Sequence, residues 1–158
     1  MRLFLAVILA GATGCSAAPA PPHAFHPQYR YMATYAPGPF TPGAAFHVDW
    51  TPELIRTDAA EPYDIRLCVG VFGAFESASA LKEAGSRAGG ARPDCPAAGA
   101  AVSSGVLRTR SDTGTALAAD LVLPVGAGLY EVRQIAINGV EPTYSAMSAG
   151  GVIEVRGP

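Results

Sequence analysis

The sequence has no excess of basic residues: of its 158 residues, 11 are Lys or Arg and 13 are Asp or Glu, which gives a formal net charge of −2. A protein that binds nucleic acid needs cationic side chains to neutralise phosphates, so we expect no nucleic-acid partner. Only 15% of the residues are charged, but 49% are hydrophobic, and this composition is typical of a globular chain. A chain of this length is expected to form one domain.

Sequence motifs for catalysis and redox chemistry are missing as well. No Gly-x-Ser-x-Gly turn presents a nucleophilic serine, and no glycine-rich loop carries the Lys-Ser/Thr of a P-loop. Cys-x-x-Cys and zinc-type Cys/His spacings are also absent. The acidic residues Glu53, Asp58, Glu61 and Asp64 lie close to arginines, as residues of a solvated rim do. We therefore predict no catalytic residue, no cofactor and no enzymatic activity.

The chain also lacks a strongly hydrophobic run of the roughly 20 residues that a membrane-spanning helix needs, because the run Leu3–Ala10 is only about eight residues long. Its first 14 residues, MRLFLAVILAGATG, instead contain one Arg, an apolar run and then small residues. This order is typical of a secretory signal peptide. We therefore expect residues 1–14 to be removed on export.

The residues around that cleavage position, Ala12-Thr13-Gly14-Cys15, resemble the lipobox of bacterial lipoproteins. In that family the cysteine is acylated and becomes the first residue of the mature protein. The resemblance therefore implies that Cys15 carries lipid and that membrane lipid is a partner. Ser16 is similar to the residue that follows the cysteine in lipoproteins sorted to the outer membrane, which implies a periplasm-facing location there.

A linker and a second possible cleavage position follow. Residues 15–28 are expected to form the lipidated N terminus and a spacer rich in Pro and Ala. Small residues cluster there too, so cleavage after Ala18 or Ala20 is an alternative. That cleavage would give a soluble periplasmic or secreted protein.

The sequence has only three cysteines. If Cys15 carries lipid, Cys68 and Cys95 remain, and a pair of cysteines in an oxidising compartment is expected to form a disulfide. Closing a loop of about 28 residues would stabilise the fold by roughly 3–4 kcal/mol in the chain-entropy model. Two separate reduced cysteines are the alternative.

Seven segments with alternating or near-alternating apolar residues predict β-strands, separated by turn residues. They are Tyr29–Tyr35, Ala45–Thr51, Tyr63–Phe72, Val106–Arg110, Ala116–Leu123, Leu129–Asn138 and Gly151–Arg156. Short strands of this kind predict an all-β, antiparallel β-sandwich domain over residues 29–158. Ile135 and Ile137 are out of phase with Tyr130, which indicates either a bulge or a strand buried on both faces.

The stretch from Leu121 to Val132 resembles the region before and within the penultimate strand of immunoglobulin-like and fibronectin-type domains. The resemblance implies that the hydroxyl of Tyr130 turns back to the preceding corner and that Trp50 is a core aromatic residue. The cysteines differ from those of antibody domains, because Cys95 does not lie on the Tyr130 strand.

A long insertion, residues 73–104, separates the third predicted strand from the fourth. Ser79–Ala84 favours one or two helical turns, and the rest is rich in Gly and Ala. A disulfide from Cys68 to Cys95 would hold this insertion on the sheet. Long loops are usually either functional or disordered, so the insertion is our first candidate for a partner-binding surface.

Three histidines and a group of aromatic residues are further binding candidates. His23, His26 and His47 would bind copper or zinc if they converged, although solvated histidines are the simpler interpretation. The aromatic residues either form the core face of an edge strand or expose a patch for a protein or glycan. They are Phe25, Tyr29, Tyr31, Tyr35 and Phe40.

These observations predict a membrane-anchored, non-catalytic lipoprotein of the bacterial envelope. Its immunoglobulin-like β-sandwich would bind or scaffold another envelope component, either a protein or a glycan. The alternative function is a periplasmic metal-binding protein that uses His23, His26 and His47.

Overall fold

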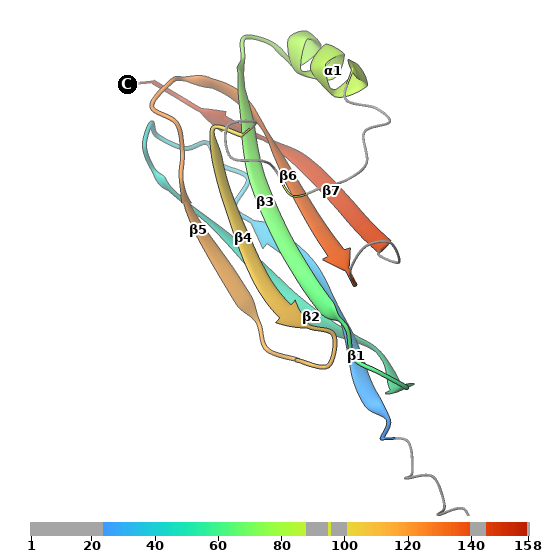
Figure 1. Cartoon of the computed structure of the whole chain (residues 1–158). Coiled ribbons are helices and arrows are strands. Elements are labelled where there is room, and N and C mark those ends of the chain that lie inside the picture. The colour runs from blue at the N-terminus through green and yellow to red at the C-terminus, as the bar shows by residue number, and fades with distance from the viewer. Residues whose placement is uncertain (1–23, 88–94, 96–100, 140–144, 158) are drawn as a thin grey trace, which may run out of the picture.

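The computed structural model of the chain describes residues 24–87, 95, 101–139 and 145–157 (Figure 1). The leader, Cys15 and His23 therefore lie outside the described residues. The described residues form seven strands and one helix. These are β1 (His26–Tyr35), β2 (Ala45–Ala59), β3 (Asp64–Phe75), α1 (Ala78–Arg87), β4 (Ser103–Arg110), β5 (Leu117–Val122), β6 (Gly128–Asn138) and β7 (Ser145–Val155).

The strands form two antiparallel sheets, one with the order β1-β2-β5 and one with the order β4-β3-β6-β7. The fold is thus the predicted all-β sandwich of seven strands, with the insertion after the third. The fourth strand pairs with β3 and not with the β1-β2-β5 sheet. A constant-type immunoglobulin domain has the opposite division, four strands in the first sheet and three in the second.

The main core lies between the two sheets and consists of the residues that point inward at every second position along the strands. Its fully buried members include Phe46, Val48, Ile65, Leu67, Val69, Val71, Val132, Ile153 and Val155. Trp50 is also buried there, and its indole Nε1 has no hydrogen-bond partner. Tyr130 lies at the start of β6, where its hydroxyl donates a hydrogen bond of 2.8 Å to the carbonyl oxygen of Gly126. This contact has the geometry of a tyrosine corner.

The N-terminal aromatic residues belong mostly to this core. Tyr31 is buried, and Tyr29, Tyr35 and Phe40 pack against the buried cluster. Tyr35 and Phe40 each contact Phe46 edge-on, with ring centroids 5.3 and 5.5 Å from its centroid. The core-face interpretation is therefore correct for these four residues. Phe25 is 69% exposed, because it precedes β1 and lies outside the core.

A second, smaller cluster covers the outer face of the β4-β3-β6-β7 sheet. Cys68, Ile135 and Ile137 are buried there, with Cys95 packed against them. The β6–β7 register runs without a shift from Gly128 to Asn138. The phase change in β6 therefore results from burial on both faces and not from a bulge.

The disulfide joins Cys68 on β3 to Cys95 in the insertion, as predicted. The two Cα atoms are 5.4 Å apart, inside the usual range for a disulfide, and 27 positions separate them in sequence. Cys68 points outward from the sheet, away from the main core, and it is fully buried with Cys95 packed against it.

Five predicted strand boundaries are wrong by three residues or more. β3 continues to Phe75 and β4 begins at Ser103, so residues 73–75 and 103–104, assigned to the insertion, belong to strands. β1 begins at His26 and not at Tyr29, so residues 26–28, assigned to the linker, belong to the sheet. β2 continues to Ala59, eight residues past Thr51. Its residues 53–58 are exposed, so they show no inward–outward alternation although they pair with β1. β7 begins at Ser145, six residues before the predicted start.

The tyrosine corner gives a direct test of the core. Substituting Tyr130→Phe removes one hydroxyl and its hydrogen bond, so we expect the free energy of unfolding to fall by about 1 kcal/mol in urea titrations. Tyr29→Phe is the matched control, because no hydrogen bond of the Tyr29 hydroxyl is seen among the described residues. Equal losses in the two variants would contradict the assigned role of Tyr130.

Candidate functional site

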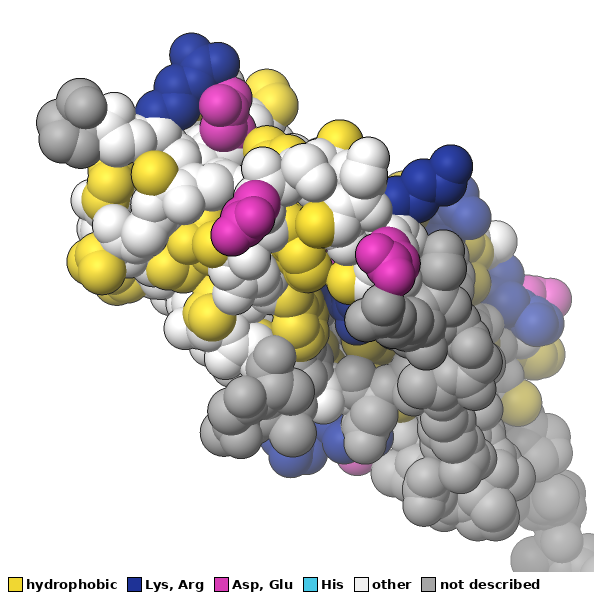
Figure 2. All heavy atoms as spheres, turned by 90° about the horizontal axis from the view of Figure 1, so that it is seen from above, with side chains coloured by type: hydrophobic (Ala, Val, Ile, Leu, Met, Phe, Trp, Pro, Cys, Tyr) yellow, Lys and Arg dark blue, Asp and Glu magenta, His cyan; other side chains and the backbone are white. Residues whose placement is uncertain are grey.

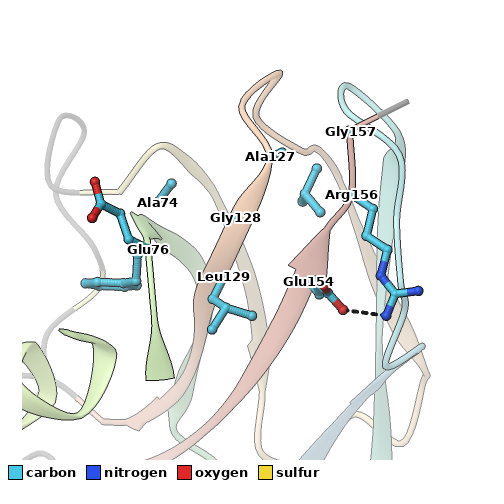
Figure 3. A pocket seen from close by; sticks show the side chains of 10 residues that line it. Ala74, Glu76, Ala127, Gly128, Leu129, Glu154, Arg156 and Gly157 are labelled. Atoms are coloured by element: carbon cyan, nitrogen blue, oxygen red, sulfur yellow. Dashed lines mark hydrogen bonds and ion pairs between the residues drawn. The ribbon is translucent and has the colours of Figure 1, made fainter. Parts of the chain in front are cut away.

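A hollow of about 570 Å³ opens at one end of the four-stranded sheet (Figure 3). The end of β3, the start of β6 and the end of β7 line it, so three neighbouring strands contribute. Its apolar lining comes from Phe75, Leu129 and Val155 together with small residues. The ten lining residues include no Ser, Thr, Cys, His or Tyr, so they supply neither a nucleophilic side chain nor an imidazole.

Two glycines make this edge of the sheet possible. Phe72 pairs with Glu131 and Phe75 pairs with Leu129, so β3 has one residue more than β6 between these pairs, which is a β-bulge. Gly73, in the bulge, has φ +134°, and a Cβ there would lie 2.9 Å from the carbonyl oxygen of Leu129. Gly128 has φ +153°. Side chains at either position would be strained, so the shape of the hollow depends on both glycines.

The charged groups of the hollow lie at its rim. Figure 3 shows Glu76 on one side and the ion pair of Glu154 and Arg156 on the other. Arg156 Nη2 lies 2.8 Å from Glu154 Oε2, and this hydrogen bond lowers the pKa of Glu154 and raises that of Arg156. The site therefore combines an apolar floor with a neutral ion pair and one further carboxylate.

The same end of the molecule exposes several large apolar side chains. Figure 2, seen from above, shows hydrophobic side chains gathered over this end with few charged side chains among them. Val125, in the turn before β6, is 84% exposed, and Val122 at the end of β5 is 67% exposed. Val102 is half exposed and hydrogen-bonds through its backbone to Val71 near the end of β3. Apolar exposure of this kind is typical of a binding surface.

The helix of the insertion borders this end. The predicted turn Ser79–Ala84 lies inside α1, which packs on β3 and β6. The hydroxyl of Ser77 accepts a hydrogen bond of 3.2 Å from the amide of Ala80, so Ser77 caps the helix. The disulfide at Cys95 and this capped helix together hold described parts of the insertion against the sheet.

The histidines do not converge. His26 pairs with Ala59 and His47 lies twelve positions before Ala59 on β2, so the two are about 40 Å apart along the strand. His26 and His47 are therefore too far apart to share a metal ion, and His23 lies outside the described residues. Among the residues that the structure describes, no group of three or more His, Cys, Asp or Glu side chains could hold a metal ion.

His47 instead joins two strands through two carboxylates. Its Nδ1 lies 2.6 Å from Asp120 Oδ1 on β5, and its Nε2 lies 3.0 Å from Asp49 Oδ1 on β2. These hydrogen bonds, that to Asp120 above all, raise the pKa of His47, because both acceptors favour the imidazolium form. Asp49 lies two positions from His47 on the same strand. Asp120 was not foreseen, since only the register between β2 and β5 brings it to His47.

This trio predicts a pH dependence of stability. Because the folded state raises the pKa of His47, the interaction stabilises fully below about pH 6.5 and is lost as pH rises through the folded-state value. Thermal unfolding of the wild type and of His47→Gln should therefore converge as pH rises. His26→Gln, which leaves the trio intact, is the control. A stability difference between wild type and His47→Gln that stays constant from pH 5 to 9 would contradict the interaction.

The described residues thus offer an apolar hollow, an adjoining helix and a solvated histidine trio. No helix in the described ranges is both long and apolar enough to cross a membrane. Comparisons with protein-family models, with curated proteins and with solved structures find no match to this chain.

Proposed function

We propose that the chain is an exported, non-catalytic lipoprotein whose β-sandwich is a binding module for a protein of the bacterial envelope. In this proposal, acylated Cys15 anchors the N terminus in a membrane, on the periplasmic side of the outer membrane. The hollow lined by Phe75, Leu129 and Val155 binds the partner.

The observation that carries the proposal is the position of the hollow relative to the start of β1. The amide of Tyr29 donates to the carbonyl of Ser111, and the amide of Ser111 donates to the carbonyl of Tyr63. The start of β1 therefore lies beside the start of β3. Figure 1 shows the two ends of β3 at opposite ends of the four-stranded sheet. The hollow lies at the end of β3 that is eleven residues, or about 36 Å, from the end beside β1.

The length of the N-terminal segment fits a tether. Eleven positions separate Cys15 from His26, so this stretch can span at most about 40 Å. A bilayer that holds Cys15 would then lie on the side of the β1 start, and the hollow would face away from it. Such a placement presents the apolar end to a partner in the surrounding compartment.

Two features support the export and the kind of partner. Disulfides persist in oxidising compartments and are rare in the cytosol, so the Cys68–Cys95 bond favours export. The hollow has aliphatic and phenyl groups for an apolar side chain, and the Glu154–Arg156 pair lies beside them for polar backbone groups. This combination suits a protein segment. The metal-binding alternative has no support from His26 and His47, because His26 on β1 lies opposite Ala59 at one end of β2 and His47 lies near the other end of β2.

Lipidation is tested by metabolic labelling of the native host with a palmitate analogue. We expect label in the wild-type protein and none in Cys15→Ala, because the variant lacks the acylated sulfur. An antibody blot of both proteins controls for expression. A wild-type protein that is produced but carries no label would contradict the anchor.

Partner binding is tested by placing a photo-crosslinking amino acid at Ala127, which is exposed at the hollow, in whole cells. We expect one main adduct with an envelope protein, and we expect Leu129→Lys to reduce it by at least about tenfold, because a charge in the apolar lining is costly to bury.

The matched control is Met32→Lys, which places the same charge at a half-exposed position of β1 in the other sheet. Thermal unfolding shows whether each variant is folded. An adduct that forms equally well in the folded Leu129→Lys protein, or that also forms from a crosslinker at Thr51, would exclude the hollow as the binding surface.

A further inference from the structure

We propose that Arg66 and Arg108 form a binding site for a phosphate group on the outer face of the four-stranded sheet. The site is separate from the hollow, and nothing in the proposed function requires it. It rests on the pairing of the arginines, on their register and on their position in the fold.

The pairing of the described arginine side chains divides them into two classes. Five of them form an ion pair with a carboxylate at 2.7–3.2 Å, and these are Arg30, Arg56, Arg110, Arg133 and Arg156. Among the described residues, Arg66 and Arg108 have no carboxylate partner. These two are therefore the exception among the described arginine side chains.

The register places these two arginines directly opposite each other. Arg66 on β3 pairs with Arg108 on the edge strand β4. Both follow the outward phase of their strands, because Ile65 and Leu67 are buried in the core on the other face. Like charges directly opposite on neighbouring strands repel and destabilise a sheet. An anion held between the guanidinium groups would remove this repulsion.

The surroundings leave the pair positively charged. Ile137, on the β6 side of Arg66, is apolar and buried, and Val106 and Cys68 form the next cross-strand pair. Within the described strands, the nearest carboxylate on this face by register is Asp64, which lies opposite Arg110. Arg110 forms an ion pair with Asp112, so the charge of Arg110 is already balanced. Asp64 then supplies one negative charge near the two positive charges of Arg66 and Arg108.

A site with two adjacent guanidinium groups is better matched by a phosphate ligand than by a ligand with a single carboxylate. Each guanidinium offers several N–H donors in a planar fork that matches phosphate oxygens, and the bonds are charge-assisted. A phosphate group presents enough oxygens for both forks. Arg66 is partly buried and Arg108 is exposed, so the site is open to solvent on the β4 side.

The position of the pair indicates the source of the phosphate. Arg66 lies near the start of β3 and Arg108 near the end of β4, the end at which β1 begins. If Cys15 anchors the chain, this end faces the bilayer, where phospholipid headgroups supply phosphate. Only this choice of source rests on the proposed anchor, since the pair itself would bind a free phosphate equally.

The test uses the full-length protein purified in a neutral maltoside detergent, with inorganic phosphate and short-chain phosphatidylglycerol as separate probes. Binding is measured by isothermal titration calorimetry, and the unfolding temperature is measured with and without each probe. We expect phosphate to bind and to raise the unfolding temperature of the wild type. Arg66→Gln and Arg108→Gln should each weaken binding by about tenfold or more.

The control is Arg56→Gln, which removes an exposed arginine of the other sheet that is paired with Asp58 and should leave the affinity unchanged. In phosphate-free buffer Arg108→Gln should unfold at a temperature no lower than the wild type, because the repulsion is relieved. Tighter binding of phosphatidylglycerol than of phosphate assigns the site to lipid, and the reverse assigns it to a free anion. Failure of both probes to bind, or equal binding by the Gln variants, would overturn the site.

Discussion

The covalent link between Cys68 and Cys95 is the constraint on which the rest of the structure depends. It ties Cys95 of the insertion to the middle of β3, on the outer face of the four-stranded sheet. Cys68, Ile135 and Ile137 are buried on that face with Cys95 packed against them, so β6 is enclosed on both faces. The outer face of the other sheet carries the solvated trio around His47. The sandwich therefore has one enclosed outer face and one polar outer face.

The two ends of the sandwich also differ in the residues that they expose. At one end, β1 begins beside the start of β3 and the end of β4, and close by lie Arg66 and Arg108, which have no carboxylate partner among the described residues. At the other end, the bulge at Gly73 interrupts the pairing of β3 with β6 and an apolar hollow lies along the strand ends. A chain anchored at its N terminus would use the first end towards the membrane and the second towards a partner. Rigid strands hold the two ends apart, and this is the kind of display for which β-sandwiches are suited.

The alternation of apolar residues predicted the seven strands, because each strand has one face in the core and a period of two. The cysteine count predicted the disulfide, because only Cys68 and Cys95 remain once Cys15 is assigned to lipid. β2 was predicted eight residues too short, since residues 53–58 are exposed and show no alternation of apolar and polar residues, although this part of β2 pairs with β1. Features that depend on the register between strands could not be foreseen. Asp120 beside His47, Arg108 beside Arg66 and the hollow at the Gly73 bulge all belong to this class.

The measurement that tests this account most directly is peptide mapping without reduction, on protein isolated from its native host with free thiols blocked at lysis. The account predicts one linked peptide pair that contains Cys68 and Cys95, with neither cysteine blocked. Recovery of both cysteines as blocked, separate thiols in the folded protein would contradict it. The covered face, the position of the insertion and the argument for export would then all lose their physical basis.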